Sequence, residues 1–177
     1  MSLVVLFLLA LAVTWWLTSR MRVTPAAVAM VAQRIHFADG GVRLTDPEGS
    51  IARLRNPEEI VIPYDTAILV IDYPLTTPAS VAITSGFAVG FTRAELVRAA
   101  CEEYSNIYEA EEATATTKTI PREERTHVKT RNRTDGAYGI YGHDLEDLVL
   151  TAMRWRREPN GSIRIELHVE AREPVVS

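Results

Sequence analysis

The stretch TRAELVRAACEEYSNIYEAEE, residues 92–112, predicts the clearest helix of the chain, a long one with a buried face. Thr92 and Glu95 have the spacing of a capping box, in which each side chain accepts a hydrogen bond from a free amide of the first turn. Apolar side chains recur at helical spacing and are predicted to face the core: Leu96, Ala100, Tyr104, Ile107 and Tyr108. The acidic side chains are predicted to form a solvated face: Glu102, Glu103, Glu109, Glu111 and Glu112.

Other segments predict strands and a second helix. Residues 67–71 (AILVI) form an apolar, β-branched run that is typical of a buried strand, and residues 80–85 alternate more weakly. Residues 162–170 alternate apolar with charged side chains, which is typical of a half-buried antiparallel strand. A second helix is predicted from Asp144, its N-cap, to the basic end at Arg157. We therefore predict an α+β domain in which a short antiparallel sheet is packed by two main helices.

The N-terminal residues 3–18, LVVLFLLALAVTWWLT, carry no charge, and Arg20 and Arg22 follow them. About 20 apolar residues cross a bilayer as a helix, and tryptophans favour its interface. We predict that residues 1–20 are a single-pass transmembrane anchor, and the basic flank favours a cytoplasmic C-terminal domain. A cleaved signal peptide is the alternative, but the segment lacks a basic start and a small-residue cleavage site.

Two regions follow the predicted anchor. Thr24 and Pro25 are typical of a helix start, so residues 21–41 predict a juxtamembrane helix that either packs on the domain or lies at the membrane surface. Residues 42–177 predict one small α+β domain, which is long enough to bury a core. The lone Cys101 forms no internal disulfide, in agreement with a cytoplasmic location, whereas two Asn-X-Ser/Thr sequons would matter only in a lumenal domain.

Charge is distributed unevenly along the chain. Three of the 19 basic residues precede Asp39, whereas all 23 acidic residues lie at or beyond it, so residues 39–177 carry a net charge of −7. An acidic domain disfavours nucleic acid as the main partner, because phosphate binding needs a basic surface. One local segment departs from this background, residues 118–133, whose basic members are Lys118, Arg122, Arg125, Lys129, Arg131 and Arg133.

This basic segment belongs to a threonine-rich stretch, residues 113–137, which predicts a long exposed loop. Residues 118–133 are suited to bind a partner protein or anionic lipid headgroups. The alternatives are a solvated loop, or ion pairs with the acidic face of the preceding helix. We assign partner contacts to the basic residues and to two tyrosines of the next segment: Arg122, Arg125, Lys129, Arg131, Arg133, Tyr138 and Tyr141.

The densest group of catalytic residue types comes directly after the glycine-punctuated segment 136–142: His143, Asp144, Glu146 and Asp147. The catalytic candidates among them are His143, Asp144 and Asp147. Histidine beside carboxylates can act in acid–base chemistry or bind a metal. However, Asp144 is also explained as a helix cap, and no second histidine stands at ligand spacing, so no metal or cofactor is predicted. Cys101 is predicted to pack in the core, because a nucleophilic cysteine favours a helix N-terminus or a basic neighbour.

The stretches GFTRAELVRAACEEYSNIYEAEE (90–112) and TDGAYGIYGHDLEDLVL (134–150) resemble a family of small uncharacterised plant proteins. The similar part covers roughly residues 60–169 and leaves the apolar N-terminal segment outside. The family has no established activity. The resemblance therefore implies only that the helices and the YGIYGHDLEDL turn belong to one recurring module, and it carries over no catalytic residue.

These observations predict a membrane-anchored, non-catalytic accessory, structural or scaffolding subunit that engages partner proteins at a membrane. One alternative is a membrane-tethered hydrolase or lyase that uses His143 with Asp144 or Asp147. Another is a small-molecule or lipid-binding module whose site lies between helix and sheet. A converging pocket around His143 would favour the enzyme.

Overall fold

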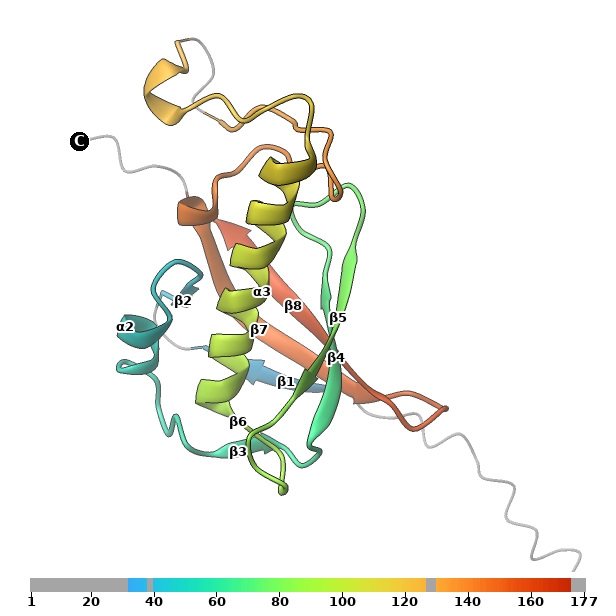
Figure 1. Cartoon of the computed structure of the whole chain (residues 1–177). Helices are drawn as coiled ribbons and strands as arrows, with labels where there is room; N and C mark the ends of the chain where they lie inside the picture. The colour runs from blue at the N-terminus through green and yellow to red at the C-terminus, as the bar shows by residue number, and fades with distance from the viewer. Residues whose placement is uncertain (1–31, 38–39, 127–129, 173–177) are drawn as a thin grey trace, which may run out of the picture. The chain divides into compact units, whose positions relative to one another are not determined.

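In the computed structural model, the described part of the chain comprises residues 32–37, 40–126 and 130–172, and one long helix crosses a face of a six-stranded sheet there (Figure 1). The strand order is β1-β7-β8-β4-β5, and β2 also pairs with β7. The elements are β1 (Gln33–His36), β2 (Val42–Arg43), α2 (Pro47–Ile51), β3 (Ile60–Ile62), β4 (Thr66–Ile71), β5 (Ala79–Thr84), β6 (Phe91–Thr92), α3 (Arg93–Thr114), the 3₁₀ turns η1 (Arg122–Glu124) and η2 (Leu145–Asp147), β7 (Leu148–Arg157) and β8 (Ile163–Ala171).

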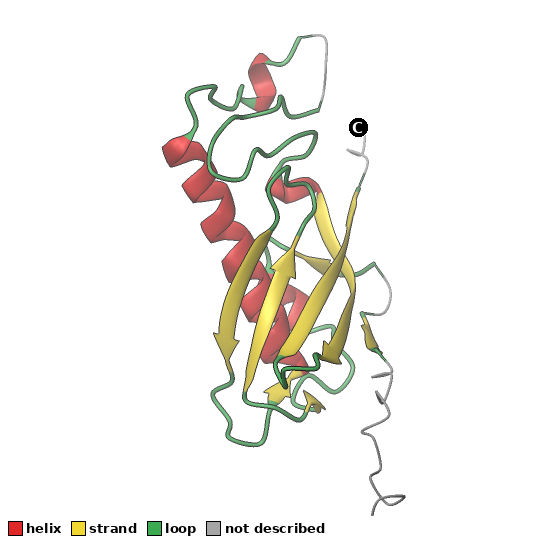
Figure 2. Cartoon of the chain, turned by 90° about the vertical axis from the view of Figure 1, so that its right-hand side faces the viewer, coloured by secondary structure: helices red, strands yellow, loops and turns green. Residues whose placement is uncertain are grey.

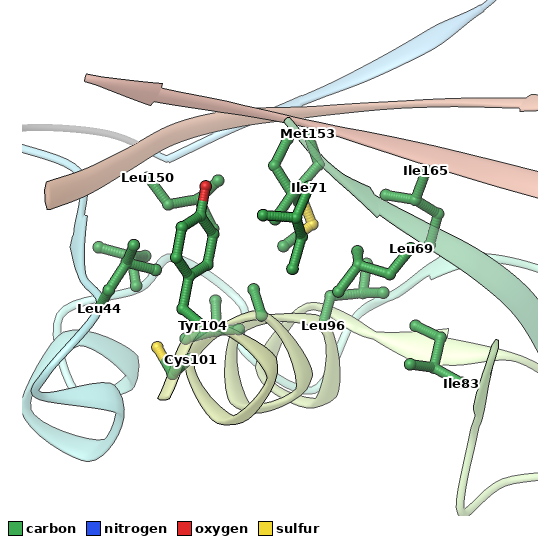
Figure 3. Packing of buried hydrophobic residues seen from close by; sticks show 14 of the residues in the cluster. Leu44, Leu69, Ile71, Ile83, Leu96, Cys101, Tyr104, Leu150, Met153 and Ile165 are labelled. Atoms are coloured by element: carbon green, nitrogen blue, oxygen red, sulfur yellow. The ribbon is translucent and has the colours of Figure 1, made fainter. Parts of the chain in front are cut away.

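The long helix α3 confirms the prediction for residues 92–112. The Thr92 hydroxyl accepts a hydrogen bond from the Glu95 N–H (3.2 Å), and Glu95 Oε2 accepts one from the Thr92 N–H (2.9 Å), so the capping box is complete. All five apolar side chains of the predicted core face are buried. Figure 3 shows this face packed on the sheet, with Leu96 and Tyr104 among the side chains that meet Leu69 and Met153.

Replacing Thr92 with alanine is expected to lower the free energy of unfolding by about 1 kcal/mol, because one amide of the first turn loses its acceptor. Urea denaturation, monitored by circular dichroism, measures the free energy of unfolding of each variant. The matched control is Asn106→Ala, which removes an exposed side chain in the middle of the same helix. An equal loss in both variants would contradict the capping role.

Cys101 packs in the core as predicted, with only 3% of its surface exposed. Burial raises the pKa of its thiol to about 12, so the reactive thiolate is scarce at neutral pH. We expect the folded chain to resist iodoacetamide and the urea-unfolded chain to react fully. Mass spectrometry measures the extent of modification, and rapid alkylation of the folded chain would contradict this prediction.

Three strands agree with the sequence pattern. β4 covers the run predicted at residues 67–71, β5 covers residues 80–84 of the run predicted at 80–85, and the two strands pair antiparallel over their full length. β8 alternates as predicted, with Ile163, Ile165 and Leu167 buried. However, β8 pairs antiparallel with β7 and parallel with β4, so the sheet is mixed, whereas we predicted an antiparallel one. Strand direction here depends on which distant segments meet, and local alternation carries no information on that.

The predicted helix from Asp144 to Arg157 is wrong. A single 3₁₀ turn, η2, leads into β7, which lies between β1 and β8. The core side chains of β7 are Leu148, Leu150, Met153 and Trp155. Their spacing is interrupted because the pairing with β8 shifts register between Leu150 and Ala152. A bulge of this kind inserts one residue and breaks the two-residue period, which makes the strand resemble a helical pattern.

The predicted N-terminal regions are only partly described. The predicted anchor, residues 1–20, lies outside the described residues, and within those residues no helix is long and apolar enough to cross a membrane. Residues 33–36 belong to the predicted juxtamembrane helix, residues 21–41, but form strand β1. β1 pairs antiparallel with β7, and only Ile35 of its four side chains is buried. One buried side chain between exposed neighbours suits an edge strand.

Candidate functional site

Glu111 is completely buried at the C-terminal end of α3, with 0% of its surface exposed. Its carboxylate accepts hydrogen bonds from the backbone N–H groups of Gly136 (2.8 Å), Tyr138 (2.8 Å) and Gly139 (3.0 Å), and a longer one from Ile140 (3.4 Å). These amides belong to residues 134–142, which we call the glycine loop. Glu111 therefore holds the glycine loop against the end of the helix.

Burial alone would raise the pKa of the Glu111 carboxyl, but the Thr134 hydroxyl and the backbone N–H groups outweigh burial and lower this pKa. Our prediction of a solvated acidic face was wrong for Glu111. The residue follows Tyr104 by seven positions and Tyr108 by three, so it continues the buried stripe of α3. This helical spacing was the sequence signal that Glu111 is buried. The amides that bind its carboxylate come from the glycine-rich segment downstream.

The glycine loop requires glycine at two positions for different reasons. A Cβ atom on Gly136 would lie 2.6 Å from the Glu111 carbonyl oxygen, so only glycine allows this close approach. Gly139 has a φ of +63°, which favours glycine. The Gly139 carbonyl accepts a hydrogen bond from the Thr76 hydroxyl (2.7 Å), which joins the loop to the connection between β4 and β5.

Asp144 is the centre of an ion-pair cluster that holds residues 118–126 and 130–133, which we call the arginine loop. Arg125 binds both carboxylate oxygens of Asp144 (2.6 and 2.8 Å), and its side chain is only 4% exposed. Arg122 bridges Asp144 (2.9 Å) and Asp147 (2.8 Å) from a half-exposed position. The predicted N-cap role of Asp144 is wrong, because its side chain makes no cap hydrogen bond to η2.

Arg131 adds a third guanidinium to this cluster. Its side chain is 7% exposed, lies over the Tyr108 ring at 5.1 Å from the centroid, and is 3.8 Å from Asp144 Oδ1 and 4.0 Å from Glu112 Oε2. Its backbone exchanges two hydrogen bonds with Gly142, at 3.2 and 3.1 Å, so the arginine loop is also joined to the glycine loop. The loop thus forms ion pairs, as one of our alternatives held, but mainly with Asp144 and Asp147.

The other predicted partner-contact residues lie outside the Asp144 cluster and differ in exposure. Lys129 lies outside the described residues, and Arg133 is exposed. Tyr138 is half-buried and packs against the core, whereas Tyr141 is 43% exposed. Of the two tyrosines, Tyr141 thus presents the larger surface to a partner.

His143 and the two aspartates do not converge as acid–base partners would. The His143 ring lies against the Tyr73 ring (5.7 Å between centroids), whereas Asp144 and Asp147 accept hydrogen bonds from arginines. Burial raises the pKa of Asp144, but hydrogen bonds and charge from Arg125 and Arg122 together outweigh burial and keep this pKa below its usual value, so the carboxyl is a poor general acid or base near neutral pH. Among the described residues, no group of three or more His, Cys, Asp or Glu side chains is arranged to hold a metal ion.

Comparisons with protein-family models, with curated proteins and with solved structures give no match for this chain, so its site is interpreted from its own geometry.

The lowered pKa values of Glu111 and Asp144 predict loss of stability in acid. Each carboxyl binds a proton more readily when unfolded, at about pH 4.3 for glutamate and 3.9 for aspartate, so its contribution is complete above those values and is lost as pH falls through the lower folded pKa. We expect the free energy of unfolding to be steady near neutral pH and to fall below about pH 4. Urea titrations at a series of pH values measure this, and Glu111→Gln and Asp144→Asn should each flatten the decline. An unchanged slope in both variants would contradict the assignment.

Proposed function

We propose that this chain is a membrane-anchored, non-catalytic accessory protein that binds a partner protein through the arginine loop and Tyr141. The uncharged residues 3–18 support the anchor. The observation that carries the binding surface is a pair of exposed apolar side chains, Ile120 and Tyr141, on segments that buried carboxylates hold in place.

Ile120 is 44% exposed and Tyr141 is 43% exposed, although both lie in an ordered part of the chain. The Ile120 N–H donates to the Asn132 side chain (2.8 Å), and the neighbouring Arg131 pairs with Gly142. The two apolar side chains therefore stand on segments that flank residues 131–132. Exposed aromatic and aliphatic side chains surrounded by polar residues are typical anchors of protein interfaces.

The Asp144 cluster supports binding by ordering the arginine loop in advance. A loop that becomes ordered only on binding loses conformational freedom, which weakens affinity. Arg125, bound at both oxygens of Asp144, fixes the segment that carries Ile120, because Arg125 Nε also donates to the Ile120 carbonyl (2.9 Å). The same pairing neutralises Arg122 and Arg125, which favours a protein partner over an anionic membrane surface at this loop.

Two observations favour this function over the alternatives. The His143 ring contacts Tyr73 in place of a carboxylate, and Asp144 is occupied by arginines, which disfavours a hydrolase or lyase. Between α3 and the sheet, where a ligand site was the other alternative, Leu96 and Met153 pack with the rest of the core (Figure 3).

The test is affinity purification of the full-length chain from its native membrane in mild detergent, followed by mass spectrometry. We expect a stoichiometric assembly with another protein. The variants Ile120→Asp and Tyr141→Ala should lose it. The matched control is Ile60→Asp, because Ile60 is also 44% exposed but lies on β3. A chain that purifies without another protein, or an assembly that Ile120→Asp and Tyr141→Ala leave intact, would overturn the proposal.

A further inference from the structure

β5 forms one edge of the six-stranded sheet, and in the part of the chain that the structure describes β4 is its sole neighbouring strand. Figure 2 shows it at the outer margin of the sheet, with α3 behind. An edge strand presents a row of unpaired N–H and C=O groups that can pair with another strand.

One hydrogen bond next to β5 shows which of its residues bond to β4 and which face the free edge. The Ser85 N–H donates to the Asp65 carbonyl (2.8 Å), and these residues continue the register in which Thr84 is opposite Thr66. Bonded and non-bonded pairs alternate along an antiparallel ladder. Val81 and Ile83 therefore direct their backbone groups toward β4. The alternate residues of β5 direct their backbone N–H and C=O groups to the free edge: Ser80, Ala82 and Thr84.

This edge has none of the features that normally prevent pairing. β5 reads ASVAIT, without charge or proline, and pairs with β4 without a bulge. The three residues with outward backbone groups are all exposed. At the opposite edge, β1 is four residues long and carries Arg34 and His36. Short length and charge protect an edge strand, so β1 is protected and β5 is not.

We propose that β5 is a homodimer interface, at which β5 of a second copy pairs antiparallel about a two-fold axis through Ala82. In this register Ala82 lies opposite Ala82, and Ser80 lies opposite Thr84, so every outward backbone group of the three residues meets a partner. Val81 lies opposite Ile83 on the core face. A slip of one residue would place core-face side chains opposite outer ones. A slip of two in one direction would bring Pro78, which has no N–H group, opposite Thr84. In the other direction it would bring Gly86, which lies beyond the strand, opposite Ser80.

Two apolar side chains are exposed in the loop that follows β5, Phe87 (51%) and Val89 (63%), and they add apolar surface at this end of the free edge. Pairing also doubles the number of strands in the sheet, which is the usual form of an isologous β interface.

Cross-linking of the full-length chain tests the position of the axis. Ala82→Cys places two thiols at the two-fold axis, and a short bismaleimide should join them. The buried Cys101 does not compete. The matched control is Thr66→Cys, an exposed position on the same face of the neighbouring strand β4. We expect a covalent dimer with Ala82→Cys and little with Thr66→Cys. Equal yields in the two variants would overturn the proposal.

Sedimentation equilibrium of the full-length chain in detergent tests the energetics. Ala82→Lys places two like charges opposite each other at the axis and should weaken dimerisation by about fivefold. Thr66→Lys adds the same charge away from the edge and should leave it unchanged. A monomeric wild-type chain at micromolar concentration would overturn the proposal, as would a dimer that Ala82→Lys leaves intact. The latter result would place self-association elsewhere, for example in the apolar residues 3–18.

Discussion

Replacing Glu111 with alanine is expected to lower the free energy of unfolding by about 3–5 kcal/mol, because buried hydrogen-bonding groups lose their partner. The carboxylate is completely buried and accepts four backbone hydrogen bonds from the glycine loop. Alanine leaves those amides without an acceptor in a site that water does not reach. Each buried amide without a partner costs about 1–3 kcal/mol, and partial relaxation of the loop reduces the sum.

Urea denaturation of the full-length chain measures this loss, with Glu109→Ala as the matched control. Glu109 is exposed on the same helix two residues earlier, so its removal should change stability by less than about 0.5 kcal/mol. Glu111→Gln should lie between the two, because its amide oxygen still accepts while its NH₂ group faces other donors. Similar values for Glu111→Ala and Glu109→Ala would show that the glycine loop does not depend on this carboxylate.

Replacing Asp144 with alanine is expected to destabilise the arginine loop by about 3–5 kcal/mol, because breaking a buried ion pair leaves the other charge poorly compensated. Arg125 is 4% exposed and binds both oxygens of Asp144, and Arg122 contacts the same carboxylate. The cluster lies beside the sheet and not in its core, so we expect local opening of the loop before global unfolding. Hydrogen exchange of residues 118–126 and 130–133 measures this opening.

Asp147→Ala is the matched control for this prediction. Asp147 contacts Arg122, whose side chain is 48% exposed, and an ion pair of that exposure contributes about 0–1 kcal/mol. Exchange in the arginine loop should therefore change little. If Asp144→Ala left exchange as slow as in the wild type, the cluster would not hold the loop. If it opened the loop but kept the partner, ordering of the loop would be irrelevant to binding.

Elements that depend on neighbours in sequence were predictable. The capping box of Thr92 and Glu95 satisfies amides within three residues, so a short motif contains all of its partners. The runs of β4 and β5 are equally local, since β4 is a short continuous apolar run with Leu69, Val70 and Ile71 buried, and β5 buries alternate side chains. In these segments the prediction and the structure agree because the sequence pattern and the side-chain spacing that it predicts both extend over only a few residues.

Local sequence patterns did not predict strand β7 or the partners of Asp144. β7 has a bulge, and its core side chains therefore follow neither the strand period nor a true helical one. Asp144 matched a helix cap in type and position, but its partners, Arg122 and Arg125, lie 22 and 19 residues away. Nothing within a local window distinguishes a carboxylate that caps a turn from one that binds distant arginines.

The sequence by itself determined where the long helix begins, which of its faces is apolar and which two runs become β4 and β5, because those features arise from contacts a few residues apart. Only the tertiary structure decided that β8 lies parallel to β4, that Glu111 is buried under the glycine loop and that Asp144 binds the arginine loop. The physical reason is burial. A carboxylate becomes a structural acceptor only when distant amides and guanidinium groups are brought to it in a site with little water.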